Sequence, residues 1–148
     1  MIAFRDAVEA DVPEIVALLA DDALGALRED GSDAAYLAAF RAMKAEQGNT
    51  LIVGEREGRV VATYQLTFIS GLSLRAARRA QVESVRVEAS LRGQGIGAAM
   101  FADAEARARA AGCALLQLTM HETRRDARRF YERLGFTASH IGFKRRLD

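Results

Sequence analysis

Cysteine, proline and tryptophan are nearly absent from this sequence. Its 148 residues include one cysteine, one proline and no tryptophan. A single cysteine cannot form an internal disulfide, which excludes the disulfide-rich scaffolds of small secreted proteins. Cys113 lies within an apolar, strand-like run, and we interpret it as a buried structural thiol rather than a nucleophile. This cysteine content is typical of the reducing cytoplasm, which is the location that we expect.

Long apolar runs and an excess of charge of one sign are also missing. No stretch approaches the ~20 apolar residues of a membrane span, and residues 1–6 lack the basic start of a signal peptide. The formal net charge is +1, so no overall field attracts nucleic acid or a membrane surface. Arginines gather in short clusters, which are either solvated faces or sites for a small anion. None is long enough to follow a nucleic-acid backbone, so we expect neither nucleic acid nor a membrane as a partner.

The residues that are present have an ordinary globular balance, with 50% hydrophobic and 28% charged. With no repeat and no linker, we expect a single domain over residues 1–148. Hydrophobic periodicity predicts a mixed α/β order with a helix from Asp11, where Glu14 completes a capping box. Further helices are predicted over 32–47, 96–111 and 125–134. Strands are predicted over 1–8, 50–56, 59–69, 81–87, 113–120, 136–140 and 142–147, with a tight turn at 57–58 and a loop or strand extension over 71–79.

A glycine-rich turn, Arg92-Gly93-Gln94-Gly95-Ile96-Gly97, joins a predicted strand to a predicted helix. Glycines allow left-handed backbone angles and the close approach of a ligand. The free N–H groups of the first helical turn lie at the positive end of the helix dipole, which suits a phosphate or pyrophosphate. A purely structural turn is an equally common interpretation. The P-loop pattern fails because no Gly-Lys-Ser/Thr follows, and a dinucleotide-binding fold would place the turn after its first strand.

A second element, residues 126–136, is a predicted helix that ends at Gly135 and enters a strand. Its inner face carries Ala127, Phe130 and Leu134, and Tyr131 taken alone is more typical of a half-buried packing residue than of an acid. The two elements at this spacing resemble the GNAT superfamily of N-acetyltransferases. The matching residues are Arg92, Gly95 and Gly97 in the turn, then Ala127, Tyr131, Gly135 and Phe136. The likeness spans nearly the whole chain and implies an α/β (α+β) fold, with a mixed, centrally splayed sheet of six to seven strands and about four helices.

The resemblance also implies that acetyl-CoA is the co-substrate. Its pantetheine arm would run along the central strand, its pyrophosphate would rest on the amides of the glycine turn, and Tyr131 would lie near the thioester sulfur. Many family members have an asparagine where this chain has Arg124, so Arg124 or Arg128 would reach a phosphate instead. The implied cofactor-binding set is Val85, Arg86, Val87, Arg92, Gly93, Gln94, Gly95, Ile96, Gly97, Ala98, Arg124 and Arg128.

The segment 125–131, followed by Ser139-His140, is similar to the aminoalkylphosphonate N-acetyltransferases. Those enzymes carry a histidine-rich stretch before the central strand, whereas residues 71–75 here contain no histidine, so no metal role is carried over. The two histidines, His121 and His140, lack a clear third ligand. We expect them to have structural or substrate-facing roles and expect no metal site.

Acetyl transfer to an amine requires the amine to be neutral. An amine with a pKa of ~10.4 is neutral in only about one part in 10³ at pH 7, equivalent to roughly 4.6 kcal/mol. Glu83, just before the cofactor-binding stretch, is the candidate general base, acting through water; a solvated strand residue is the alternative. Tyr131 is the candidate acid that protonates the departing thiolate.

The sequence thus predicts transfer of an acetyl group to the primary amine of a small molecule by direct attack in a ternary complex. An anionic acceptor and a homodimer through the last strands are both compatible with it. The alternative functions are a protein or peptide N-acetyltransferase and a non-catalytic acyl-CoA-binding module.

Overall fold

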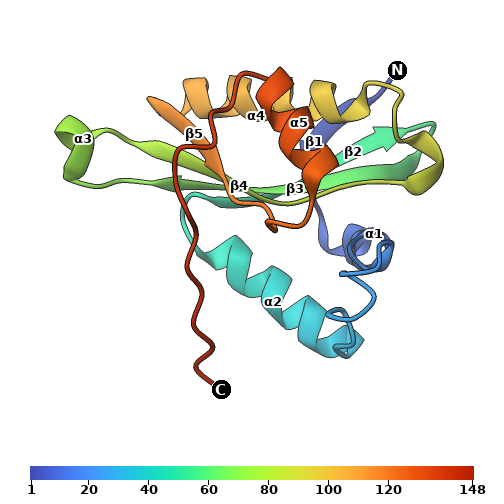
Figure 1. Cartoon of the computed structure of the whole chain (residues 1–148). Helices are drawn as coiled ribbons and strands as arrows, with labels where there is room; N and C mark the ends of the chain where they lie inside the picture. The colour runs from blue at the N-terminus through green and yellow to red at the C-terminus, as the bar shows by residue number, and fades with distance from the viewer.

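A five-stranded sheet separates two layers of helices in the computed structural model, which describes all 148 residues (Figure 1). The strands lie in chain order across the sheet. Neighbouring strands are antiparallel except for β4 and β5, which are parallel as expected for the centre of the predicted fold. The strands are β1 (Ala3–Asp6), β2 (Asn49–Arg56), β3 (Arg59–Ile69), β4 (Arg79–Val87) and β5 (Leu115–Leu118).

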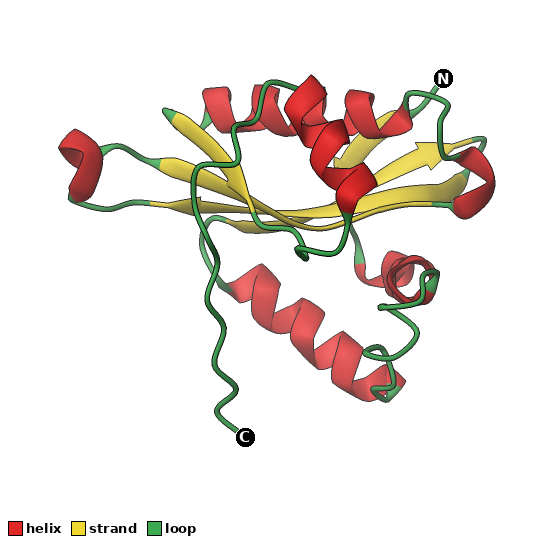
Figure 2. Ribbon diagram, viewed as in Figure 1, coloured by secondary structure: helices red, strands yellow, loops and turns green.

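The helices cover both faces of the sheet. Helices α1 (Val12–Ala20) and α2 (Asp33–Ala45) lie on one face, and α4 (Ile96–Ala110) and α5 (Arg125–Arg133) lie on the other (Figure 2). The remaining helix, α3 (Ser73–Ala76), is a single turn between β3 and β4. Two 3₁₀ turns occupy Glu9–Asp11 and Ala89–Leu91. No helix combines the length and the apolar composition that crossing a membrane would require.

Two hydrophobic cores follow from the alternation of side chains along the strands. On the α4 side, β3 contributes Ala62, Tyr64 and Leu66, which pack against Met100 and its neighbours on α4. The smaller core lies beneath α1 and α2. The buried Tyr64 hydroxyl donates a hydrogen bond to Asp103 Oδ2 (2.5 Å), and burial raises the pKa of this phenol well above its ordinary value. This buried hydrogen bond fixes α4 on the sheet.

The predicted hairpin and helix starts are largely confirmed, but the capping box at Asp11 is wrong. Helix α1 has Asp11 as its N-cap without a side-chain capping bond. The Asp11 carboxylate instead accepts hydrogen bonds from Arg5 (2.7 and 3.0 Å) and from the Val8 N–H (2.8 Å). Glu14 accepts from the Val60 N–H on the sheet (3.2 Å). A charge-assisted pair with a guanidinium is stronger than a cap to a neutral amide, which explains the difference.

The two strands predicted over 136–140 and 142–147 are also wrong, and the sheet therefore has five strands rather than six or seven. The segment 137–148, called the tail below, contains no strand or helix. Its one backbone hydrogen bond joins the Ser139 N–H to the Thr137 carbonyl (2.9 Å). The tail leaves α5 and extends away from the body of the molecule (Figure 1). A strand exists only when a neighbour satisfies its backbone groups, and this chain places no strand beside its own tail.

Candidate functional site

The centre of the site is the place where β4 and β5 diverge. The two strands pair from Arg79 opposite Leu115 to Val82 opposite Leu118. Beyond this point residues 83–87 of β4 have no partner strand on the β5 side. Ser84 has a positive φ of 54°, and the register with β3 shifts at the same place, which is the behaviour of a β-bulge. The sheet is therefore splayed, as predicted, although the opening lies between β4 and the edge strand β5. One wall of the opening is strand backbone without a partner strand, where the Val85 and Val87 carbonyls accept side-chain hydrogen bonds from Arg86 (2.9 Å) and Arg92 (3.1 Å).

The glycine turn lies directly after this backbone. Gly93 and Gly95 have φ values of 79° and 81°, the left-handed region that favours glycine. None of the six N–H groups from Gly93 to Ala98 donates a hydrogen bond within the chain, and the first helical bond runs from the Ala99 N–H to the Gly95 carbonyl (3.1 Å). These free donors lie at the positive end of a 15-residue helix. Such an arrangement can hold a phosphate or pyrophosphate.

The third glycine of the turn has a packing role as well. A Cβ atom on Gly97 would lie 3.0 Å from Cζ of Phe130, so this glycine lets α5 approach α4. The Arg92 side chain donates from Nε to the Val87 carbonyl (3.1 Å) and from Nη2 to the Asp21 carbonyl (3.1 Å). It thereby connects the glycine turn to the end of β4 and to the loop after α1.

Tyr131, on α5, is half-buried against aromatic rings. Its ring packs edge-to-face on Phe101, with centroids 5.5 Å apart, and on Phe130 and Phe136. Val85 and Val87 of β4 pack against the same core. The Tyr131 hydroxyl makes no hydrogen bond within the protein. Burial raises the pKa of Tyr131, an effect that the positive charges of Arg124 and Arg86 only partly offset, so the phenol is protonated at neutral pH and free to donate.

Glu83 lies on the other face of the sheet. Val82 and Val85 both pack on the α4 side, on either side of the bulge, so Glu83 and Arg86 point toward the α1 and α2 layer. Glu83 is exposed, pairs in register with Gln65, and its carboxylate makes no hydrogen bond. The splayed opening thus has the candidate acid on one face and the candidate base on the other.

A charged triad that the sequence did not predict lies on the Glu83 face. Arg124 Nη2 donates to Asp22 Oδ2 (3.0 Å), and Arg86 Nε lies 3.5 Å from the same oxygen. The Gly25 N–H donates to the other Asp22 oxygen. The Arg86 side chain is 15% exposed, and its buried Nε has no hydrogen-bond partner of good geometry. Two guanidinium groups therefore share a single carboxylate.

The charges of this triad are perturbed by burial and by each other. Burial lowers the pKa of the Arg86 guanidinium, although the group stays charged. Burial acts to raise the pKa of Asp22, but the Gly25 N–H and the two arginines outweigh it and hold this pKa below its ordinary value. No local pattern could have revealed Asp22, since Arg124 is 102 residues away along the chain. The one signal was Arg124 itself, which departs from the family's asparagine.

The remaining predicted residues lie outside this opening. Arg128 donates from Nε to Glu132 Oε1 (3.0 Å) and is 62% exposed on α5. The ring nitrogens of His121 and His140 each contact a neighbouring hydroxyl group. No group of three or more His, Cys, Asp or Glu side chains is placed to hold a metal ion.

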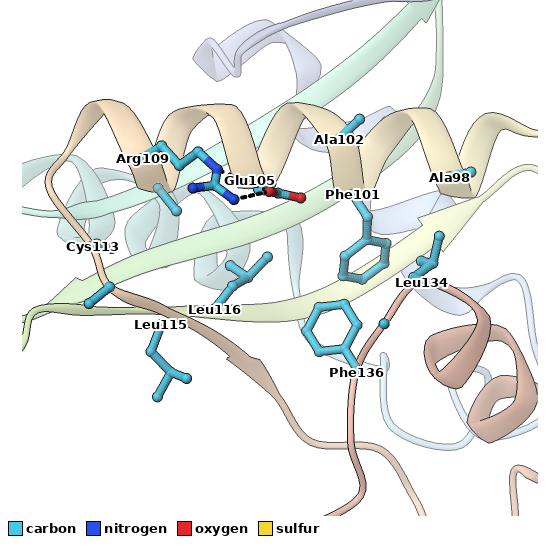
Figure 3. A pocket seen from close by; sticks show the side chains of 13 residues that line it. Ala98, Phe101, Ala102, Glu105, Arg109, Cys113, Leu115, Leu116, Leu134 and Phe136 are labelled. Carbon is cyan, nitrogen blue, oxygen red and sulfur yellow. Dashed lines mark hydrogen bonds and ion pairs between the residues drawn. The ribbon is translucent and has the colours of Figure 1, made fainter. Parts of the chain in front are cut away.

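A cavity of about 360 Å³ lies at the opposite end of β5, between α4, the start of β5 and the end of α5 (Figure 3). Most of its lining is apolar, including Phe101, Leu116 and Phe136, and Cys113 is among its lining residues. It includes neither Tyr131 nor Glu83. This α4–β5 cavity is therefore separate from the splayed opening.

Comparison with known proteins identifies the family of this chain. The sequence model of the acetyltransferase (GNAT) family matches residues 13–136. An aminoalkylphosphonate N-acetyltransferase of Salmonella typhimurium is 42% identical over 67 residues, a match that covers 45% of this chain and less than half, 44%, of that relative.

Two solved structures extend the comparison to nearly the whole chain. A crystal structure described as a transcriptional regulator from Bacillus halodurans C-125 is 41% identical, with a TM-score of 0.95 over 99% of this chain and 100% of that one. A predicted acetyltransferase from Clostridium acetobutylicum, solved with acetyl-CoA, has a TM-score of 0.73 at 18% identity over 97% of this chain and 96% of that one. At that identity the likeness concerns the fold alone.

Proposed function

Because this chain belongs to the acetyltransferase (GNAT) family, we propose that it transfers the acetyl group of acetyl-CoA to the primary amine of a small molecule that carries an anionic group. The observation that carries the proposal is the splayed opening. It places a row of free amides, a protonated phenol and a pair of arginines around one gap in the sheet.

The binding of acetyl-CoA follows from the free backbone groups. The amides from Gly93 to Ala98 would hold the pyrophosphate, with Arg92, Gln94, Ile96 and Gly97 forming the turn around it. The unpaired edge of β4 at Val85, Arg86 and Val87 would hydrogen-bond the pantetheine arm as an added strand. Arg128 is exposed on α5, about one helical turn before Tyr131. From this position its side chain would approach a phosphate of the cofactor. The structure with acetyl-CoA that shares this fold supports the choice of co-substrate.

The residues of this chain are assigned two proton transfers, one from the acceptor amine and one to the departing thiolate. Acetyl-CoA supplies the acyl group as a thioester, and the acceptor nitrogen forms the new bond to the carbonyl carbon as the carbon–sulfur bond breaks. Glu83 takes the proton of the amine through a water molecule. The Tyr131 hydroxyl delivers a proton to the departing sulfur. A free N–H on the splayed edge of β4 would stabilise charge on the carbonyl oxygen. No covalent intermediate with the enzyme is needed, so Cys113 has no part in the reaction.

Replacing Glu83 by glutamine is expected to flatten the alkaline rise of kcat/KM and to lower the rate by ~10²-fold or more, the usual contribution of a general base. Glutamine keeps the size of the side chain but cannot accept the proton. The pH profile of kcat/KM measures this, and Glu57→Gln in the exposed β2–β3 turn is the matched control. An unaltered profile would move the base role to another residue.

The acceptor class follows from the Asp22 triad. Two guanidinium groups that face one carboxylate are matched to an anion with several oxygens, because each guanidinium can donate two parallel hydrogen bonds. An incoming carboxylate or phosphonate would replace Asp22 between Arg86 and Arg124, with its amine directed toward the splayed opening. The Salmonella relative is named an aminoalkylphosphonate N-acetyltransferase, and this name supports an anionic amine as the acceptor.

A panel of amines tests the function and the class together. Aminoalkylphosphonates and amino acids are expected to be acetylated with a higher kcat/KM than alkylamines of equal length, polyamines or aminoglycosides. Arg124→Gln is expected to raise KM for the anionic acceptors by ~10- to 100-fold, since a hydrogen bond to a charged group contributes about 1.5–3 kcal/mol. The KM for acetyl-CoA should stay unchanged. The exposed neighbour Arg125 provides the control, as Arg125→Gln.

Three other outcomes would favour a different role for Arg124 or a different function for the chain. A rise in KM for acetyl-CoA in Arg124→Gln would favour the cofactor contact predicted from the sequence. Acetylation of lysine peptides in preference to every free amine would favour a protein acetyltransferase, and no transfer at all would favour an acyl-CoA-binding module. The presence of both Tyr131 and Glu83 argues against the last. DNA binding, suggested by the description of the Bacillus relative, is not favoured by a net charge of +1.

A further inference from the structure

Two consecutive aspartates in the loop after α1, Asp21 and Asp22, contact different walls of the splayed opening. Asp22 lies between the two arginines of its triad. Asp21 lies on the side of the glycine turn, where its carboxylate accepts a hydrogen bond from the Ala89 N–H (3.3 Å) and is 3.5 Å from Arg92 Nη2. The Asp21 carbonyl accepts a hydrogen bond from the same Nη2 (3.1 Å). This aspartate pair therefore connects the anion site proposed for the acceptor with the residue that begins the glycine turn.

The two aspartates are expected to move together, because the Asp22 side chain is fixed by its own turn. The Gly25 N–H donates to one oxygen of the Asp22 carboxylate, and the Ala26 N–H donates to the Asp22 carbonyl (2.8 Å). Short polar side chains commonly make such local bonds, and here they hold the carboxylate in one orientation. An anion that takes its place between the arginines would therefore displace the backbone as well. Asp21, one peptide bond away, would then lose its contacts on the cofactor side.

The charge at the glycine turn depends on where Asp21 lies. Arg92 directly precedes the amides of residues 93–98, which would hold the pyrophosphate. The Asp21 carboxylate partly neutralises the Arg92 guanidinium and adds a negative charge near the phosphates. When Asp21 withdraws, Arg92 loses both of these contacts but keeps its Nε hydrogen bond to the Val87 carbonyl (3.1 Å). The guanidinium thus stays beside the turn and can pair with a phosphate.

We propose that the aspartate pair couples the two substrates: an anion in the Asp22 triad raises the affinity for acetyl-CoA, and acetyl-CoA raises the affinity for the anion by the same factor. In the free protein the pair is closed on its arginines. With both substrates bound it is open, so that Arg86 and Arg124 face the acceptor and Arg92 faces the pyrophosphate. The Arg92 and Asp21 side chains are 50% and 45% exposed, so water screens their attraction. We therefore expect a coupling of ~5- to 10-fold, at the low end of the usual range. The identity of both ligands rests on the proposed function.

Titration calorimetry with two unreactive ligands tests the coupling. Methylphosphonate has the anion but no amine, and CoA has the pyrophosphate but no acetyl group, so no transfer occurs. We expect the dissociation constant of CoA to fall ~5- to 10-fold in saturating methylphosphonate, and that of methylphosphonate to fall by the same factor in saturating CoA. Independent binding of the two ligands overturns the coupling, and so does competition between them. Neither result bears on acetyl transfer itself, which the turnover of the amine panel decides. Failure of methylphosphonate to bind at millimolar concentration overturns both the coupling and the anionic acceptor class.

Asp21→Asn separates the coupling from binding at either site. Asparagine keeps the size of the side chain but removes the charge next to Arg92, so this variant should bind CoA alone about as tightly as the wild type does with methylphosphonate. Methylphosphonate should still bind, and it should change the affinity for CoA by less than about twofold. Asp30→Asn removes the same charge from an exposed position of the same loop and is the matched control, in which the full coupling should remain. Equal coupling in Asp21→Asn and in the wild type would rule out the aspartate pair as its cause.

Asp22→Asn tests whether the anion displaces the Asp22 carboxylate. With a neutral amide between the two arginines, methylphosphonate should bind at least ~10-fold more tightly than it binds to the wild type, because a charged competitor for the same hydrogen bonds is removed. Equal or weaker binding would show that the anion and Asp22 do not share a place, and it would overturn the opening of the aspartate pair.

Discussion

Replacing Tyr131 by phenylalanine is expected to lower kcat by ~10²–10⁴-fold, the usual contribution of a positioned acid, with little change in the affinity for acetyl-CoA. The hydroxyl is the one group removed, and it makes no hydrogen bond within the protein. The ring contacts with Phe101 and Phe136 remain, so the fold should lose almost no stability. Because burial raises the pKa of this phenol, wild-type activity should show no loss from Tyr131 ionisation anywhere in the neutral range.

Tyr64 offers the converse substitution. Its hydroxyl donates to the half-buried Asp103, and its removal should cost about 1–3 kcal/mol of unfolding free energy because a hydrogen bond to a charged group is lost, although Arg107 still donates to the same oxygen (2.8 Å). Tyr64→Phe should therefore lower Tm and keep kcat, whereas Tyr131→Phe should keep Tm and lower kcat. Steady-state kinetics, equilibrium binding of acetyl-CoA and thermal denaturation of both variants measure this. Unchanged turnover in Tyr131→Phe would remove Tyr131 as the acid.

Replacing Gly95 by valine is expected to abolish measurable acetyl-CoA binding at micromolar concentrations while the protein still folds. Gly95 is the left-handed N-cap of α4, and no atom lies within 4 Å of the position of a Cβ there. The valine side chain would therefore extend from the turn without a clash. It would also resist the left-handed backbone angle that keeps the neighbouring amides free for the pyrophosphate.

The matched control is a glycine with the same geometry and no part in the site. Gly58, in the β2–β3 turn, also has a positive φ (76°) and open space around its Cβ position. Both valine variants should lose a similar stability, of about 1–2 kcal/mol for a left-handed side-chain-bearing residue. Only Gly95→Val should lose binding, measured by titration calorimetry. Micromolar affinity in Gly95→Val would contradict the pyrophosphate assignment, and equal loss in Gly58→Val would attribute the effect to instability.

Local patterns explain the parts of the fold that the sequence predicted. The glycine turn before Ile96 marks the start of α4, and Gly135 marks the end of α5. Both signals are readable from the sequence because a glycine determines the backbone conformation only of the residues next to it. The hairpin at 57–58 is confirmed for the same reason, with Glu57 and Gly58 both at positive φ. The splayed sheet was predicted from the family resemblance that includes Tyr131. No single helix or strand pattern could have indicated it.

The errors arise where the partner of a residue is distant along the chain, or where a segment has no neighbouring strand. Asp11 has the correct residue type for a helix cap, but its carboxylate forms a salt bridge with Arg5 on β1 instead. The tail had the alternation of a strand, but alternation indicates only which faces are apolar and does not supply a neighbouring strand. Asp22 was missed because its arginines come from β4 and from the start of α5, and only the folded chain brings them together.

The contact between Gly97 and Phe130 has a consequence for how the protein can vary. The missing side chain at Gly97 sets how closely α5 approaches α4, and Tyr131 follows Phe130 directly. The separation between the amides at the start of α4 and the phenol on α5 must match the covalent length of one extended ligand, from its phosphates to its sulfur. A larger residue at 97 would lengthen that separation, so positions 97 and 130 should change together among descendants of this sequence or stay as they are.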